Sequence, residues 1–135
     1  EEGQFEKMMT TNMNSAYHTT RGLWSLLKKS QRAHVFNMCS IASITAYAAG
    51  GSYSVSKFAL LGFSKSLRLE GLPHNIRVTA ILPGATLTDS WAGVDLPPSR
   101  FMKPEDVAEV LFSAFSSNQN TVMEEVVLRP ILGDI

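Results

Sequence analysis

In the centre of this sequence, a long stretch with helical periodicity lies between two short apolar runs. The run at 34–39 is apolar and predicts a buried strand that ends at Ser40. Two glycines then precede an amphipathic pattern that predicts a helix from 51 to about 71. A second apolar run at 76–82, closed by Pro-Gly, predicts another strand. The residues that could take part in a reaction lie within or next to these three predicted elements.

Three side chains within this frame can cooperate in proton transfer. Tyr53 and Lys57 are four residues apart and would lie on one face of the helix, one turn from each other. A neighbouring ammonium favours the phenolate and lowers the pKa of a tyrosine from its usual value of about 10. Such a tyrosine can give a proton to a carbonyl oxygen or take one from a hydroxyl. Ser40, from a different element, would offer a hydroxyl to the same oxygen, which predicts a site for carbonyl and alcohol chemistry.

The Tyr-x-x-x-Lys pair is a weak signal by itself. In a chain of this composition, chance places a lysine four residues after some tyrosine about one time in eight. A surface tyrosine beside a solvated lysine explains the isolated pair equally well. The flanking strands and Ser40 favour the functional interpretation.

Further residues complete a resemblance to the short-chain dehydrogenase/reductase family. They are Asn12 in TTNMNSAYHTT, Ser40 thirteen residues before Tyr53, YSVSK at 53–57, and PGATLT at 83–88. The resemblance covers nearly the whole chain. It implies an α/β fold with a partial doubly wound, Rossmann-like parallel sheet, helices on both faces, and NAD(P)-dependent oxidation or reduction.

One large departure accompanies the resemblance. The family's N-terminal half, with its Gly-rich dinucleotide loop and Asn-Asn-Ala-Gly segment, is absent from this chain. Residues 1–135 would then form the C-terminal catalytic portion of a single Rossmann-like domain. The residue that distinguishes NAD from NADP lies in the absent half, so the choice between them stays open.

The resemblance implies a catalytic role for four residues. Ser40 would polarise the substrate carbonyl and Tyr53 would donate the proton. Lys57 would lower the pKa of Tyr53 and hold the nicotinamide ribose. Asn12 would help to hold an ordered water that connects the lysine to solvent, whereas by spacing alone it is a polar residue on a wet helix face.

The resemblance also implies contacts to the cofactor just beyond the second strand. The implied cofactor-binding residues are Tyr53, Lys57, Pro83, Gly84, Thr86 and Thr88. Thr88 is the better supported of the two threonines. A polar turn after a strand is the plain alternative, although the carboxyl edge of a parallel sheet is where α/β folds bind ligands.

The remaining segments predict supporting structure. A helix at 2–29 carries apolar residues close to the helical period, and the helix at 51–71 is apolar on more than one face. In the resembling family these helices pack against a second subunit, so we expect a homo-oligomer, a dimer or a tetramer. The segment 90–101 resembles a substrate lid, a helix begins at Pro104, and 125–129 predicts a last short strand.

Several single residues carry smaller expectations. Tyr47, in an irregular loop at 41–49, either touches substrate or caps the core, and we favour the core. Cys39, the only cysteine, is expected to be buried rather than reactive, and it fits a reducing, cytoplasmic setting without a disulfide. Thr79 stands where many relatives carry Asn and is expected to be structural. The tail at 129–135 replaces the Gly-rich tail of many relatives and marks a subgroup without an assigned substrate.

Composition and motifs exclude other classes. Twelve basic and twelve acidic residues give zero net charge, which predicts no nucleic-acid or anionic-membrane partner. No apolar run reaches the roughly 18 residues of a membrane span, and the acidic start is not a signal peptide. The three histidines lack a second metal ligand at usable spacing. The segment at 50–54 lacks the second glycine of a serine-hydrolase elbow.

Two hypotheses for function remain from the sequence. The first is an oxidoreductase that acts on a small-molecule carbonyl or alcohol. Its substrate is a small ketone or hydroxy acid, a sugar alcohol, a steroid-like ring or an acyl thioester. The second is an inactive fragment or interaction module, because the missing phosphate loop leaves the pyrophosphate without a helix N-terminus.

Overall fold

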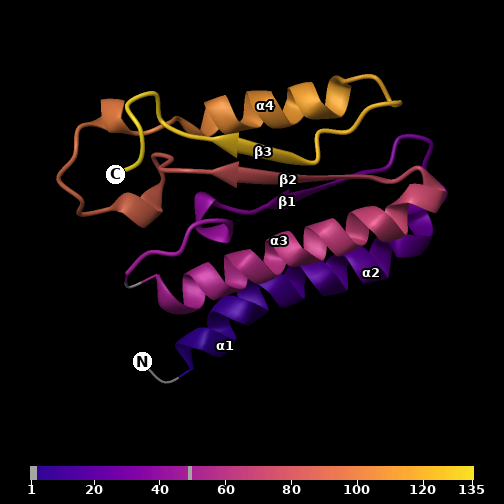
Figure 1. Ribbon diagram of the computed structural model, residues 1–135, viewed down its shortest axis with the longest axis horizontal. Helices are drawn as coiled ribbons and strands as arrows, with labels where there is room; N and C mark the ends of the chain where they lie inside the picture. Colours follow the sequence, from indigo (N-terminus) through magenta and orange to yellow (C-terminus); the bar gives the residue numbers. More distant parts are fainter. Residues whose placement is uncertain (1–2, 49) are drawn as a thin grey trace.

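The computed structural model describes residues 3–48 and 50–135, and it has an α/β fold (Figure 1). Three parallel strands form one sheet in the order β1-β2-β3. The strands are β1 His34–Met38, β2 Arg77–Pro83 and β3 Glu125–Leu128. The strands expected at 34–39 and 76–82 are neighbours in this sheet, with His34 opposite Arg77 and Met38 opposite Ile81.

Helices cover both faces of this sheet, as predicted. They are α1 Gln4–Met9, α2 Ser15–Leu27, α3 Gly51–Gly71 and α4 Pro104–Ser116. Figure 1 shows α2 and α3 side by side on one face and α4 on the opposite face. The bounds of α3 are those expected from the sequence.

The core lies between α3 and the central strand. β2 is buried along nearly its whole length because it is paired on both edges and covered on both faces. Its alternate residues Val78, Ala80 and Leu82 pack with α3. The core cluster contains Ala33, Cys39, Leu60, Leu61, Phe63, Leu67, Ile76, Val78, Ala80 and Leu82.

A buried polar layer lies on the α4 side of the sheet. The Thr79 hydroxyl donates to the Met123 carbonyl at 2.6 Å and lies 2.7 Å from Nε2 of His34. Arg77 donates to the carbonyls of Ala114 and Phe115 at 3.5 and 3.2 Å, near the C-terminus of α4. A cation suits that end of a helix, where carbonyls lack intrahelical partners. The expectation that Thr79 is structural is confirmed.

The first helix departs from the single helix predicted at 2–29. A π-helical turn, Thr10–Asn14, separates α1 from α2, and the helix ends at Leu27. Threonine and asparagine are weak helix formers, and the Ser15 hydroxyl donates to the Thr11 carbonyl at 2.5 Å within this turn. Glu2 lies outside the described residues.

The strands shift by one residue from their predicted ends. β1 stops at Met38 because the next amide, of Cys39, turns back to the Asn37 carbonyl at 2.9 Å. β2 starts at Arg77 because the Ile76 amide caps α3 through the Gly71 carbonyl at 3.1 Å. β3 ends at Leu128 instead of residue 129.

Large apolar side chains are exposed on the helical layer. Leu26 on α2 is 60% exposed and Leu69 on α3 is 66% exposed. The prediction that α3 is apolar on more than one face is therefore confirmed. None of the described helices is long and apolar enough to span a membrane.

Candidate active site

A cavity of about 700 Å³ lies at the carboxyl ends of β1 and β2. Ser40 and Tyr53 line it together with Pro83, Gly84, Thr86 and Thr88. Six of the eight predicted site residues thus face one space, at the edge of the sheet where α/β proteins bind ligands.

Ser40 is held rigidly at the end of β1. It begins the 3₁₀ turn Ile41–Ser43, and its Oγ accepts a hydrogen bond from the Ala42 amide at 3.1 Å. Its own amide donates to Oγ of Ser43 at 3.2 Å, so the two serines cap the turn reciprocally. The Ser40 hydroxyl keeps its proton to donate, because Ala42 uses only an acceptor lone pair. Sequence reasoning missed Ser43, although serine three residues after a serine is a capping-box pattern.

Tyr53 and Lys57 lie on one face of α3, as their spacing predicts. The Lys57 ammonium is 5.7 Å from the centre of the Tyr53 ring. It also donates to the Met38 carbonyl at 2.8 Å, which ties α3 to the end of β1. Burial lowers the pKa of Lys57, and a smaller electrostatic interaction with Cys39 opposes that shift. The lysine therefore bridges the tyrosine and the strand that carries Ser40.

Asn12 reaches the site indirectly. It lies in the π-helical turn, and its side-chain amide donates to Oγ of Ser56 at 2.9 Å. Ser56 in turn donates to the Tyr53 carbonyl at 2.7 Å. The turn is therefore linked through the Ser56 side chain to the backbone of Tyr53. Such π-helical turns are often found at functional sites.

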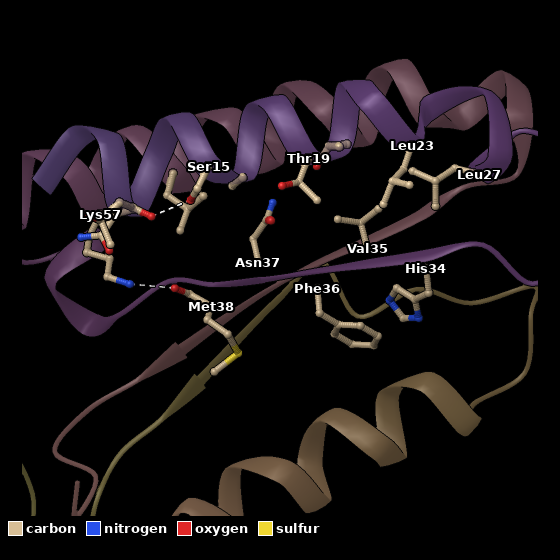
Figure 2. A pocket seen from close by; sticks show the side chains of 15 residues that line it. Ser15, Thr19, Leu23, Leu27, His34, Val35, Phe36, Asn37, Met38 and Lys57 are labelled. Carbon is tan, nitrogen blue, oxygen red and sulfur yellow. Dashed lines mark hydrogen bonds between the residues drawn. The ribbon is translucent and has the colours of Figure 1, made fainter. Parts of the chain in front are cut away.

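Asn12 and Lys57 also line a groove of about 530 Å³ along the outer edge of β1 (Figure 2). Figure 2 shows the Lys57 ammonium directed at the Met38 carbonyl, with Val35 and Leu23 farther along the groove. The two remaining predicted residues thus lie beside the cavity, on the side where β1 has no partner among the described strands.

The segment after β2 is closed into a loop above the cavity. The Thr86 hydroxyl donates to the Gly84 carbonyl at 3.1 Å, and the Thr88 and Ser90 hydroxyls are 2.7 Å apart. A parallel bridge between Thr86 and Met102 pins the base of the predicted lid. Within the lid, Trp91 and Val94 line the cavity.

Three further cavity residues were not expected. Tyr47 was favoured as a core residue, which is wrong: its ring is 52% exposed and lines the cavity, because the loop carries it away from the sheet. Asp134 and Ile135 come from the tail, and a turn at Gly133 brings them back to the cavity. Ala49, the end of the predicted irregular loop, lies outside the described residues.

Cys39 is buried beside Ser40, and burial raises the pKa of its thiol. The expectation of a buried, unreactive cysteine is in line with that environment. Across residues 3–48 and 50–135, the histidine, cysteine and acidic side chains form no cluster that could hold a metal ion.

Comparison with known proteins places this chain in a family. The short chain dehydrogenase family matches residues 1–97. The chain belongs to that family.

Individual relatives carry several activities. The chain is 34% identical over 135 residues to sepiapterin reductase of Chlorobaculum tepidum, covering 99% of this chain and 55% of that protein. It is 28% identical over 133 residues to 3-oxoacyl-[acyl-carrier-protein] reductase of Aquifex aeolicus, covering 91% of this chain and 54% of that protein. The chain thus spans about half the length of the curated relatives it matches.

Solved structures have the same fold. An alcohol dehydrogenase from the archaeon Thermococcus sibiricus, complexed with 5-hydroxy-NADP, superposes with a TM-score of 0.87 at 22% identity, covering 97% of this chain and 55% of that one. A β-ketoacyl-[ACP] reductase from Bacteroides thetaiotaomicron gives a TM-score of 0.78 at 28% identity, covering 95% and 53% of the two chains.

Proposed function

We propose that the protein carrying this chain is an NAD(P)-dependent oxidoreductase that interconverts a carbonyl and an alcohol, with Tyr53 as its acid and base. The observation that carries the proposal is the shared cavity: two hydroxyls, Ser40 and Tyr53, face the same space as the segment from Pro83 to Thr88. Membership of the short chain dehydrogenase family supports it.

Each residue has a distinct task in this proposal. The nicotinamide cofactor, when bound, supplies or accepts the hydride. Tyr53 gives its proton to the carbonyl oxygen in reduction and takes it back in oxidation. Ser40 donates its free O–H to the same oxygen and orients the carbonyl. The hydrogen bonds that Ser40 makes with Ala42 and Ser43 fix the direction of that bond.

Lys57 supports Tyr53 by charge. Its ammonium lies 5.7 Å from the centre of the tyrosine ring and would stabilise the negative charge that develops on the phenol oxygen as the proton leaves. One of its three N–H donors binds the Met38 carbonyl, which leaves two for ribose hydroxyls. Asn12 then acts as a support for α3 through Ser56, and we propose that it also holds a water near Lys57.

The residues present fit the nicotinamide end of the cofactor. Gly84 has no side chain where the backbone lies close to the cavity and to β3, since a Cβ there would be 3.3 Å from the Leu128 carbonyl. Tyr53, Lys57, Pro83, Gly84, Thr86 and Thr88 would hold the nicotinamide ring, its carboxamide and its ribose. NADP is named with one solved neighbour and NADH with another, so either cofactor fits this proposal.

We further propose that residues 1–135 form the C-terminal catalytic portion of the domain, in a cytoplasmic protein. The phosphate-binding part would come from a segment that these residues do not include. The rival is that the 135-residue chain alone is an inactive fragment or interaction module. NADH or NADPH fluorescence titration separates them, because tight binding by the 135-residue chain alone would reject the inactive fragment.

The exposed apolar surface of α2 and α3 favours a homo-oligomer. Leu26 on α2 and Leu69 on α3 would be covered by a second copy. Sedimentation of the full-length protein tests this, and a monomer at all concentrations would contradict it.

Tyr53→Phe tests the proposed function directly. Removing the only acid expected to reach the carbonyl should lower kcat/KM by about two to four orders of magnitude. The measurement is NAD(P)H oxidation by the full-length protein with a panel of ketones and diketones. Tyr17→Phe on α2, a residue outside the cavity, is the matched control. Near-normal turnover by Tyr53→Phe would reject the assignment.

A further inference from the structure

The tail after β3 folds back onto the candidate active site. Gly133, in the left-handed backbone region with φ 83°, donates its amide to the Pro130 carbonyl at 2.9 Å. Glycine adopts this conformation without strain. The turn leaves Ile131 98% exposed, whereas Asp134 and Ile135 line the cavity with Ser40 and Tyr53.

Two arginines hold Asp134 from different segments. Nε of Arg129, at the end of β3, lies 3.1 and 3.0 Å from the two carboxylate oxygens of Asp134. Arg100, in the lid, donates to the backbone carbonyl of Asp134 at 3.3 Å. The tail is therefore closed on itself by Arg129, its first residue, and bound to the lid by Arg100.

Both ends of the tail lie next to Gly84, in the segment proposed to bind the cofactor. The Gly84 amide donates to the Leu128 carbonyl at 2.8 Å, and a Cβ on Gly84 would lie 3.5 Å from the Asp134 carboxylate. The tail thus starts next to Gly84 and returns beside it, on the cavity that Ser40 and Tyr53 also line.

We propose that Asp134 is a positioning residue, and that the Arg129–Asp134–Arg100 clamp holds Ile135 as a wall of the substrate pocket that limits substrate size. This inference rests on the proposed function of the cavity. Ile135 contributes an apolar surface to a pocket that Trp91 and Val94 also line. The clamp therefore favours compact carbonyl substrates and disfavours bulky ones.

The first experiment changes the wall in the full-length protein. Ile135→Ala should raise the ratio of kcat/KM for a bulky aryl diketone to that for a small aliphatic diketone by about threefold or more. Ile135→Trp should lower the same ratio. Ile131→Ala, an apolar tail residue outside the cavity, is the matched control and should leave it unchanged. Ratios within twofold of wild type for both Ile135 variants would overturn the proposal.

The second experiment tests the clamp without relying on activity. Asp134→Asn and Arg129→Met should accelerate hydrogen exchange of the amides at 133–135 by about three- to tenfold, while Glu109→Gln on α4 should not. The charge-swapped double variant, Arg129→Asp with Asp134→Arg, should restore part of the protection. Unchanged exchange in Asp134→Asn would overturn the clamp.

The two failures can be told apart. If Tyr53→Phe is fully active, the proposed function fails, and the exchange experiment still decides whether the clamp exists. If Tyr53→Phe is inactive and the Ile135 variants keep the wild-type substrate ratio, only the inference about the wall fails.

Discussion

Ser43 positions the candidate catalytic serine without facing the substrate itself. It is fully buried, and its hydroxyl accepts the Ser40 amide proton at 3.2 Å. A buried amide that loses its partner costs about 1–3 kcal/mol. The position of the Ser40 hydroxyl therefore depends on the 3₁₀ turn that Ser43 stabilises.

Ser43→Ala should therefore lower both stability and activity. We expect the free energy of unfolding to fall by about 1–3 kcal/mol, and kcat to fall more than KM rises, because Ser40 loses its fixed direction. Urea unfolding and steady-state kinetics of the full-length protein measure the two effects. Ser113→Ala, an exposed serine on α4, is the control, and equal behaviour of the two variants would contradict this role.

His34 makes stability depend on pH. Burial, and secondarily the charge of Arg77, lowers the pKa of His34 to about 4. Its Nε2 lies against Thr79, whose own proton goes to Met123, so the ring donates there and its buried Nδ1 has no partner among the described residues. The rings of Phe36 and Phe115 stack nearby and offer no charge to balance a proton.

The direction in which pH changes stability follows from the proton affinity of His34 in the folded and the unfolded chain. The unfolded chain binds a proton at His34 near pH 6.5, while the folded chain does so only near pH 4. The unfolding free energy should therefore fall as pH drops from about 6.5 to 4 and level off below. Urea unfolding across this range measures the slope. His34→Gln should reduce it, and an unaltered slope in that variant would assign the effect to other groups.

At the scale of elements, α3 was predictable because its signals are local. Two glycines open it, its apolar residues follow a helical period, and a Gly-Leu-Pro sequence closes it. The strands were predictable for the same reason. The one-residue shifts at the end of β1 and the start of β2 come from backbone hydrogen bonds of the adjoining turns, which hydrophobic periodicity does not register. The π-helical turn was missed because periodicity over 2–29 does not resolve one shifted turn.

The residues of the candidate site likewise fall into those that local motifs predict and those that they do not. Ser40, Tyr53 and the segment from Pro83 are carried by motifs in the chain, and the structure brings them to one cavity. The positions of the tail residues Asp134 and Ile135 depend on contacts with residues far away in the sequence. No local pattern predicts the direction that the chain takes after the turn at Gly133.

The end of α3 depends on the absence of a side chain at Gly71. A Cβ there would lie 2.8 Å from the Ile76 carbonyl, in the tight connection to β2. Gly71→Ala should destabilise the fold by about 1–3 kcal/mol despite the better helix propensity of alanine. Thermal or urea unfolding measures this. Gly62→Ala, with open space around its Cβ, is the control and should be neutral or stabilising, and a neutral Gly71→Ala would contradict the close contact.

At the scale of the whole molecule, β1 has one free edge. β2 pairs with one side of it, and no described strand pairs with the other, where the groove of Figure 2 runs. Unpaired amides and carbonyls on an apolar strand recruit another chain. In the resembling family that edge pairs with a strand of the N-terminal half.

We expect the isolated 135-residue chain to associate or to be unstable, whereas the full-length protein is soluble. Size-exclusion chromatography at several concentrations measures this, with larger species growing as concentration rises. A monodisperse monomer that unfolds cooperatively would show that the edge is protected in another way.

The π-helical turn also fixes the angular relation between the two halves of the first helix. Each residue of an α-helix advances the chain by about 100° around its axis, so one residue too many or too few rotates everything before it by that angle. Deleting Met13 or Asn14 would therefore turn α1 and Asn12 away from Ser56, although every residue of α2 kept its place.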